Sequence, residues 1–595
     1  MKKSALLIKG FLTLVVVFIG LGQTQYFVVP PEDLPDGPGK RGGSITMDLP
    51  SEPETFNPIL AQGESSKAVV KLINGTLFEY PRTPALVKEY TFSEDDRILT
   101  LYLRQGIQFS DGVEMTCDDV AFTFNDVVFN DDVASSKEIW KIEGEFPRIE
   151  CTGEYTVQFI TPARFSGLIE FLLTQQPILP HHLLADKVHK LNPDVPAGNF
   201  NTVWGVGTSP EEIAGLGPFR LREYIPGQQV VLERNPYFWK VDSNGTQLPY
   251  LDQIILPIVR EDSVRVMRYL NCETDLLRPR PEDVFAIVDR GLYVEVRGAG
   301  VTNSHIFIFN QDTKDPALRA VFREGRFRQA MSYAADRESM IALCLSGYGE
   351  PRCGPGIAPI FWHGCQNQPD FPCFSFDLEE AARILDDLGL EDTDGDGIRN
   401  ITDKFLEDHN VSLDGLPEED RRELKFEILA DQGSTTSVCT TEVYTDALRR
   451  LGIKIIPNPV PLASLMDALR RGDYEVARMG LITNGDPNVL ADIYHSKGRA
   501  HYWKPSDTDG EDIADWQQRI DEILMAQKTA PGDTRWDMMC EFQRLVAENV
   551  PMVFLYNVSE IQAYKKDRLG NFKGIEGMAT ILYSEYLFLY EYLGG

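Results

Sequence analysis

Tyr474-Glu-Val-Ala-Arg-Met-Gly-Leu-Ile-Thr-Asn-Gly-Asp-Pro-Asn488 is the stretch of the sequence that decides the fold class. Its first half alternates as a strand does, and one face of that strand is expected to carry Tyr474, Val476, Arg478 and Gly480. The residues from 483 to 487 are Thr-Asn-Gly-Asp-Pro, a composition that predicts a turn. A strand that ends in a polar turn is a common place for a binding site.

Two similar strands precede this one, at 424–430 and 454–456, and helical stretches at 441–451 and 462–471 separate the three. Strands that alternate with short helices predict a parallel, right-handed βαβαβ unit. In open parallel sheets, ligands bind just beyond the carboxyl ends of the strands. The turn after the third strand is therefore predicted to contact a ligand.

The length and net charge of the chain limit the number of domains and the kinds of partner. A chain of 595 residues is too long for one hydrophobic core and predicts about three to four domain-sized units. With 58 Lys and Arg against 90 Asp and Glu, the formal net charge is −32. We therefore expect no nucleic acid and no anionic membrane as a main partner, because both need clustered positive charge. The simplest reason for the acidity is a well-solvated surface.

The N-terminus predicts export. Lys2 and Lys3 precede an apolar run at Phe11–Leu21, which fits a signal peptide over residues 1–22 better than a spanning helix. An uncleaved N-terminal anchor is the alternative. Residues 23–42 are rich in Pro and Gly and predict a flexible tether. The protein is thus expected in the periplasm or on the extracellular face of the cytoplasmic membrane.

The nine cysteines show no Cys-x-x-Cys spacing, which disfavours zinc and thioredoxin-like sites. After export, disulfides are expected, above all in the cluster between Cys344 and Cys373. The odd number leaves at least one thiol unpaired within the chain. Motifs of common enzymes, such as Gly-x-Ser-x-Gly, His-Glu-x-x-His and the phosphate-binding Gly-Lys-Ser/Thr loop, are absent from the sequence, so no catalytic residue is predicted.

Four blocks together resemble one family. In chain order they are YLRQGIQFSDGVEMTCDDVAFTF (102–124), GLGPFRLREYIPGQQVVLERNPYFW (215–239), FRQAMSYAADRESMI (327–341) and the helix followed by DTDGDG (378–397). Together they resemble the extracytoplasmic solute-binding proteins of peptide-type ABC importers, a class that includes oligopeptide-, dipeptide- and nickel-binding proteins. The resemblance covers nearly all of residues 43–590.

This resemblance implies an α/β fold, a bilobal clamp of the periplasmic-binding-protein type II that is enlarged by an inserted domain. The implied units are a discontinuous lobe I (43–85, 208–300 and 561–595), an inserted domain (86–207) and lobe II (303–560). A monomeric receptor would capture a small peptide-like ligand by lobe closure and deliver it to an ABC permease complex in the membrane. Two alternatives stay open: an oligosaccharide receptor of the same family, and a peptide-sensing or chaperone-like protein that serves no importer.

The resemblance also implies ligand-binding residues. Arg478 matches an Arg that lies at the ligand cleft of oligopeptide binders, although a structural ion pair would also explain it. Asn484 stands where those proteins carry an Asp that pairs with the peptide α-ammonium, and a neutral amide offers no such charge; Asp486 is a substitute. Core packing is the alternative for the aromatic residues. The expected ligand set is Phe56, Asn57, Trp362, Arg478, Thr483, Asn484, Asp486, Tyr502 and Trp503.

The segment from Asp392 to Gly397 resembles a calcium loop, with carboxylates at alternate positions and Gly at the sixth. No cofactor is required for the expected function, but a structural calcium ion is predicted here. An exposed acidic turn is the alternative. The expected metal ligands are Asp392, Asp394, Asp396, Asn400 and Asp403.

Overall fold

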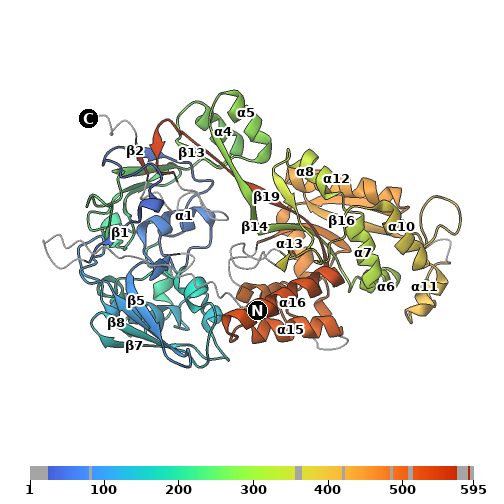
Figure 1. Ribbon diagram of the computed structural model, residues 1–595, viewed down its shortest axis with the longest axis horizontal. Helices are drawn as coiled ribbons and strands as arrows, with labels where there is room; N and C mark the ends of the chain where they lie inside the picture. The colour runs from blue at the N-terminus through green and yellow to red at the C-terminus, as the bar shows by residue number, and fades with distance from the viewer. Residues whose placement is uncertain are drawn as a thin grey trace, which may run out of the picture.

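A computed structural model of the chain describes residues 25–79, 83–355, 365–366, 368–418, 422–482, 487–506, 513–572 and 587–589. It is a mixed α/β molecule of two lobes joined by two long strands, β14 (Val294–Phe309) and β19 (Met552–Tyr564) (Figure 1). The first half of the chain builds one lobe and its inserted domain, and the second half builds the other. The expected bilobal α/β clamp is confirmed.

Lobe I is organised around a four-stranded sheet in the order β2-β12-β10-β9. Its alternating strands bury one face, as Val230 and Leu232 do in β10 and Ile254 and Leu256 do in β12. Helix α1 packs against β9. The elements are β2 (Ser44–Thr46), α1 (Glu64–Ile73), β9 (Phe219–Ile225), β10 (Gln229–Arg234) and β12 (Gln253–Pro257).

The inserted domain has its own antiparallel sheet, in the order β5-β6-β8-β7, which lies at the lower left in Figure 1. The helix predicted after Thr116 begins there, and a reciprocal capping box between Thr116 and Asp119 fixes its first turn. The elements are β5 (Val87–Phe92), β6 (Ile98–Leu103), α2 (Cys117–Ala121), η2 (Phe122–Val128), β7 (Arg148–Gly153), β8 (Thr156–Ile160), η4 (Leu168–Leu173) and α3 (His181–Leu184).

Lobe II contains the predicted βαβαβ unit: β16 (Lys425–Asp431), α12 (Thr435–Arg450), β17 (Lys454–Val460), α13 (Leu462–Arg471) and β18 (Val476–Ile482). Strand β16 is parallel to both β17 and β18. Strand β17 is longer than predicted because it lies at the sheet edge, where Pro457 and Pro459 remove no interior ladder bond. The sheet is mixed, since β14 runs antiparallel to β18.

Helices cover both faces of this sheet. One face packs Phe307, Phe426 and Val476 under α12 and its neighbours, and the other packs Ile306 and Ala477 against a second helical layer. The remaining helices are α6 (Pro316–Arg323), α7 (Gly325–Tyr333), α8 (Arg337–Cys344), α10 (Leu378–Asp387), α11 (Asp403–Asp408), α14 (Ala491–Tyr494), α15 (Asp515–Ala526) and α16 (Gly532–Asn549).

The two lobes are connected by strands. The expected boundaries at 300–303 and 560–561 fall within β14 and β19, which pair with each other along most of their length. Their far ends reach β13 (Leu276–Leu277), α4 (Asp262–Leu270) and α5 (Val284–Asp289). The β14–β19 ladder shifts register three times between Arg297 and Ile306, so its pairing is irregular where the chain passes between lobes.

The expectation of a flexible tether over 23–42 is wrong for the part that the structure describes. Phe27 and Val28 form a parallel pair with Lys240 and Val241, and Val29 is fully buried. The cations of Arg104 and Lys240 lie 5.1 and 6.0 Å from the Phe27 ring centroid. These apolar side chains bury too much surface for the segment to stay free, and its Pro and Gly content misled the prediction.

Four disulfides link Cys117 to Cys151, Cys344 to Cys439, Cys353 to Cys373 and Cys365 to Cys540, and Cys272 is free and exposed. Only one of these bonds closes within the cluster between 344 and 373, because its other cysteines face α12 and α16. Short strands complete the described fold: β1 (Phe27–Val28), β3 (Phe78–Glu79), β4 (Thr83–Pro84), β11 (Lys240–Val241), β15 (Gly349–Pro351), β20 (Leu569–Gly570) and β21 (Phe588–Leu589).

Candidate ligand-binding site

Arg478 is the centre of a polar network on the sheet of lobe II. Its side chain lies on β18, is 4 % exposed, and reaches across β14. One guanidinium nitrogen, Nη2, donates to Nδ1 of His305 at 2.8 Å and to the Tyr556 hydroxyl at 2.9 Å. Among the residues that the structure describes, no carboxylate pairs with Arg478. The structural ion pair considered above is therefore absent from the described part of the chain.

The hydrogen bond from Arg478 fixes the tautomer of His305. A guanidinium can only donate, so Nδ1 of His305 must accept and the ring proton must lie on Nε2. Burial lowers the pKa of His305 well below its ordinary value, and the neighbouring Arg478 charge lowers it further. His305 is therefore neutral at physiological pH, and its Nε2–H is a donor.

Several polar atoms around this network lack a hydrogen-bond partner although they are shielded from solvent. Most buried polar atoms in native proteins are paired, with protein or with water. Such a concentration at one end of a sheet indicates a place where a ligand or ordered water completes the bonding. The unpaired atoms are Nε of Arg478, Nε2 of His305, Oγ of Ser304, both amide atoms of Asn557 and Oγ of Ser437.

Helix α12 covers this network with hydroxyl groups. Ser437, Thr440 and Thr441 lie three and four residues apart, share one helix face and are buried. The Thr440 hydroxyl lies 2.6 Å from that of Tyr556 and so extends the chain of bonds that begins at Arg478. A buried, polar helix face next to an unneutralised guanidinium can hold an anionic or strongly polar ligand group.

The structure places other expected ligand residues in the core. Phe56 and Asn57 are fully buried in lobe I, where the Asn57 amide donates to Val203 O and accepts from the Ile59 N–H. Trp503 is 1 % exposed and packs against Tyr494. These three side chains are buried, as the packing alternative expects, and Nε1 of Trp503 has no hydrogen-bond partner among the described residues. Their role in ligand binding stays a prediction.

Tyr502 is half-buried, and its carbonyl accepts a hydrogen bond from the Tyr474 hydroxyl at 2.6 Å. Trp362, Thr483, Asn484 and Asp486 lie outside the described residues, so their assignment stays a prediction. The Arg478 network also includes His305, Ser304 and Asn557, which sequence reasoning did not single out. The signal for His305 was available, since a histidine that opens the otherwise apolar strand HIFIFN needs a polar partner.

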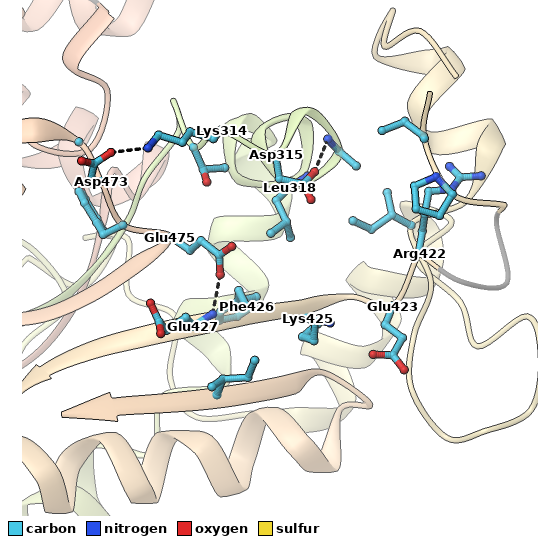
Figure 2. A pocket seen from close by; sticks show the side chains of 18 residues that line it. Lys314, Asp315, Leu318, Arg422, Glu423, Lys425, Phe426, Glu427, Asp473 and Glu475 are labelled. Atoms are coloured by element: carbon cyan, nitrogen blue, oxygen red, sulfur yellow. Dashed lines mark hydrogen bonds and ion pairs between the residues drawn. The ribbon is translucent and has the colours of Figure 1, made fainter. Parts of the chain in front are cut away.

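A cavity of about 600 Å³ lies elsewhere in lobe II, at the amino ends of β16 and β18 (Figure 2). Glu475 points into it and accepts a hydrogen bond from the Glu427 N–H at 2.6 Å. Lys314 pairs with Asp473 at 2.6 Å, and Asp315 caps helix α6. These charges have partners within the chain, but Nε and Nη1 of Arg422, which also lines the cavity, are buried without a hydrogen-bond partner in the described part of the chain; its Nη2 pairs with Asp403.

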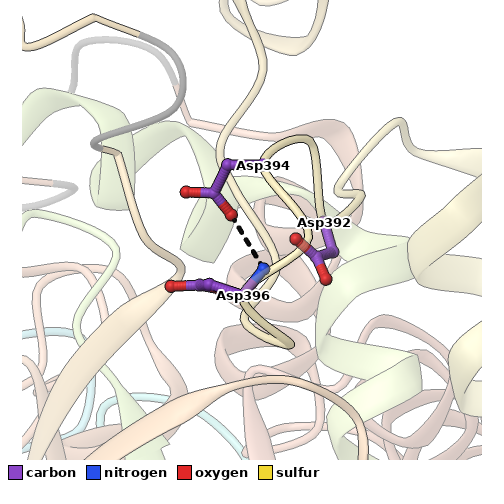
Figure 3. Close-up of side chains that lie close together, drawn as sticks. All are labelled: Asp392, Asp394 and Asp396. Carbon is purple, nitrogen blue, oxygen red and sulfur yellow. Dashed lines mark hydrogen bonds between the residues drawn. The ribbon is translucent and has the colours of Figure 1, made fainter.

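The Asp392–Asp396 loop forms a compact, exposed acidic turn (Figure 3). Carboxylate oxygens of Asp392, Asp394 and Asp396 lie within 4.8 Å of one another. The Gly397 and Gly395 N–H groups hold the pKa of Asp392 below its ordinary value. The Asn400 amide oxygen accepts from the N–H and hydroxyl of Thr393 within the loop, whereas Asp403 pairs with Arg422. Of the five expected ligands, the structure brings the carboxylates of Asp392, Asp394 and Asp396 together.

Calcium binding by the three aspartates stays a prediction. We expect millimolar Ca²⁺ to raise the melting temperature, because a bound cation would screen three adjacent carboxylates. Saturation at 100 times the dissociation constant adds about 2.7 kcal/mol. Thermal unfolding with Ca²⁺ or Mg²⁺, in the wild type and in Asp394→Asn, is the measurement. Equal melting curves with and without Ca²⁺ would leave the loop as a simple acidic turn.

A pH prediction follows from His305. Because its pKa is lower in the folded state, the unfolded chain binds the extra proton first, and stability is lost as pH falls below about 6.5. One proton gives a slope of up to about 1.4 kcal/mol per pH unit. Urea unfolding between pH 8 and 5 should show this slope in the wild type relative to His305→Gln. Parallel pH profiles of the two proteins would contradict it.

The molecule has two lobes that two long strands connect. A buried polar network lies beside the parallel strands of lobe II. These features are those of a two-lobed solute receptor. The family model described as "Bacterial extracellular solute-binding proteins, family 5 Middle" matches residues 82–501. The chain belongs to this family. No helix among the described residues has the length and apolar character needed to cross a bilayer.

Individual relatives of the chain are also binding proteins. A probable ABC transporter-binding protein of Deinococcus radiodurans is 28 % identical over 484 residues, 77 % of each chain. A periplasmic alpha-galactoside-binding protein of Rhizobium meliloti is 23 % identical over 560 residues, 88 % of this chain and 77 % of that one. The structure of the oligopeptide-binding protein AppA of Bacillus subtilis with a nonapeptide has a TM-score of 0.68 at 20 % identity, covering 93 % of this chain and all of that one.

Proposed function

We propose that this protein is the solute receptor of an ABC importer and captures a peptide-like ligand that carries an anionic group. It works outside the cytoplasmic membrane, delivers the ligand to the permease complex and makes or breaks no bond. The signal peptide over 1–22, the anchor alternative and the monomeric state are parts of this proposal. The family and the named relatives support the role in binding and transport.

The observation that carries the ligand class is the unneutralised charge of Arg478. A buried guanidinium without a carboxylate is costly, and a ligand carboxylate would supply both the counter-charge and an acceptor for the free Nε–H. The neutral His305 Nε2–H offers a second donor near the same charge. A terminal carboxylate of a peptide, or an acidic side chain within one, has the required chemistry.

A sugar ligand is the second candidate. The Asn557 amide has both its donor and its acceptor unpaired, and the Ser304 and Ser437 hydroxyls are also unpaired. Neutral groups of this kind suit hydroxyl-rich ligands, and one relative is named as an alpha-galactoside binder. Under this alternative Arg478 would donate to sugar oxygens.

Mass spectrometry of the ligand released from the purified protein by denaturation tests the two candidates directly. We expect an acidic or free-carboxylate peptide. A thermal-shift panel of peptides and oligosaccharides then checks the assignment, since a ligand that binds only the folded state raises the melting temperature. A neutral oligosaccharide as the released ligand, with no shift from any peptide, would replace the first candidate by the second.

A further inference from the structure

Ser166 of the inserted domain directs all three of its polar groups at lobe II. Its N–H donates to the Lys528 carbonyl at 2.7 Å, and its hydroxyl donates to the Ala530 carbonyl at 2.5 Å. Its own carbonyl accepts from the Asn488 amide at 3.3 Å. The inserted domain and the α15–α16 pair accordingly lie next to each other in Figure 1. One residue thus makes a complete hydrogen-bonded contact between two units that are far apart in sequence.

Lobe II holds its side of this contact in a fixed arrangement. The two acceptor carbonyls belong to the turn between α15 and α16. Gln527, at the start of that turn, is fully buried and donates to the Asn488 side-chain oxygen at 2.8 Å. Arg535 in turn donates to Gln527 at 2.8 Å. The chain from Arg535 through Gln527 to Asn488 therefore presents its groups to Ser166 without needing to rearrange.

The inserted domain fixes Ser166 equally well. Phe165 before it is buried, and Gly167 after it has a φ of 104°, a conformation that L side chains rarely adopt. Helix η4 follows directly, and its Leu168, Ile169, Leu172 and Leu173 are buried. Ser166 is thereby held at the surface by a tight turn between two buried anchors.

The connection between the lobes suits a contact that opens and closes. The β14–β19 ladder carries its three register shifts where the chain crosses between lobes, and hinge motions use a few such positions. Hydrogen bonds at a half-buried residue exchange readily with water, so their net stabilisation is modest. Three such bonds can bias closure without making it irreversible.

We propose that Ser166 is a closure latch: its contact with Lys528, Ala530 and Asn488 forms when the lobes close and breaks when they open. This inference rests on the proposed receptor function, because a receptor that captures its ligand by closing must also be able to open again. Its geometry does not depend on which ligand is bound.

The test compares a locked and a blocked protein by small-angle X-ray scattering without added ligand. In a Cys272→Ser background, Ser166→Cys with Ala530→Cys should form a cross-lobe disulfide. Ser166→Arg should prevent the contact, because a long, charged side chain replaces a hydroxyl that fits between two carbonyls. We expect the blocked protein to have a larger radius of gyration than the locked one.

Ser136 provides the matched control, as an exposed serine of the same domain without a side-chain capping bond. Ser136→Arg should scatter like the wild type, and Ser136→Cys with Ala530→Cys should not cross-link. Circular dichroism and the melting temperature show whether each variant is folded. If Ser166→Arg does not fold, Ser166→Ala takes its place as the blocked protein. Equal scattering profiles of the folded blocked protein and the wild type would overturn the latch, whether or not the cysteine pair cross-links. A failed peptide prediction would leave both results unchanged.

Discussion

Replacement of Arg478 by Met should weaken the binding of a ligand with a free carboxylate by about 30-fold or more. Loss of one partner of a buried, hydrogen-bonded charge pair costs about 2–5 kcal/mol, and each 1.4 kcal/mol is tenfold in affinity. Calorimetric titration with a tripeptide and with its C-terminal amide measures the effect. The wild type should prefer the free acid strongly, and Arg478→Met should bind the two forms about equally.

Arg449→Met is the matched control, since Arg449 is an exposed arginine near the end of α12 in the same lobe. It should leave both affinities unchanged. Arg478→Lys keeps the charge but loses the planar donor arrangement that reaches His305 and Tyr556, so an intermediate affinity is expected. If Arg478→Met still preferred the free acid as strongly as the wild type, the charge of Arg478 would have no part in recognition.

Arg478→Met should affect the free energy of unfolding much less than it affects ligand affinity. An unpaired buried charge destabilises the ligand-free protein, and an apolar side chain of similar volume removes that cost. Arg478→Met also removes the donors to His305 and Tyr556, so the two effects oppose each other, and ligand-free Arg478→Met should lose far less stability than Arg337→Met. A residue whose removal lowers affinity far more than stability is kept for function.

Sequence reasoning predicted the parallel βαβαβ unit because hydrophobic periodicity in 424–482 reports burial directly. It also singled out Arg478, since a charge on a buried strand face needs a partner; Arg478 is buried, and its contact with a ligand stays a prediction. It did not find Tyr556 or Asn557, which pair with His305 and Ser304 across β14 and β19. That pairing joins residues about 250 positions apart, and no local pattern encodes such a register.

The errors have physical causes as well. Phe56, expected from the resemblance, and Trp503, expected because flat aromatic rings suit ligands, are both buried, and such apolar area stabilises a core at least as well. Residues 25–42 were read as a tether from Pro and Gly content, whereas Phe27 and Val29 decide their packing. Composition reports average behaviour, and a few buried side chains override it.

Arg337 should show the largest stability effect of any arginine considered. It is 5 % exposed, and burial lowers its pKa to about 10, so it remains protonated at neutral pH. Its Nε donates to the Arg352 and Phe554 carbonyls at 3.0 and 2.8 Å. Its Nη1 donates to the Phe374 carbonyl at 2.9 Å, and its Nη2 to the Ser332 hydroxyl at 2.8 Å. Every nitrogen of this guanidinium therefore has an acceptor within the chain.

Arg337→Met should lower the free energy of unfolding by about 3–5 kcal/mol, because it strands several buried acceptors that no water can reach. Urea unfolding of Arg337→Met, Arg478→Met and Arg449→Met measures the three cases side by side. Arg337 and Arg478 are similarly buried arginines of one lobe, yet every nitrogen of Arg337 has an acceptor within the chain, whereas Nε of Arg478 has none among the residues that the structure describes. Large destabilisation by Arg337→Met and little by Arg478→Met would separate a structural arginine from a ligand-binding one. Similar losses in both would mean that Arg478, too, is structural.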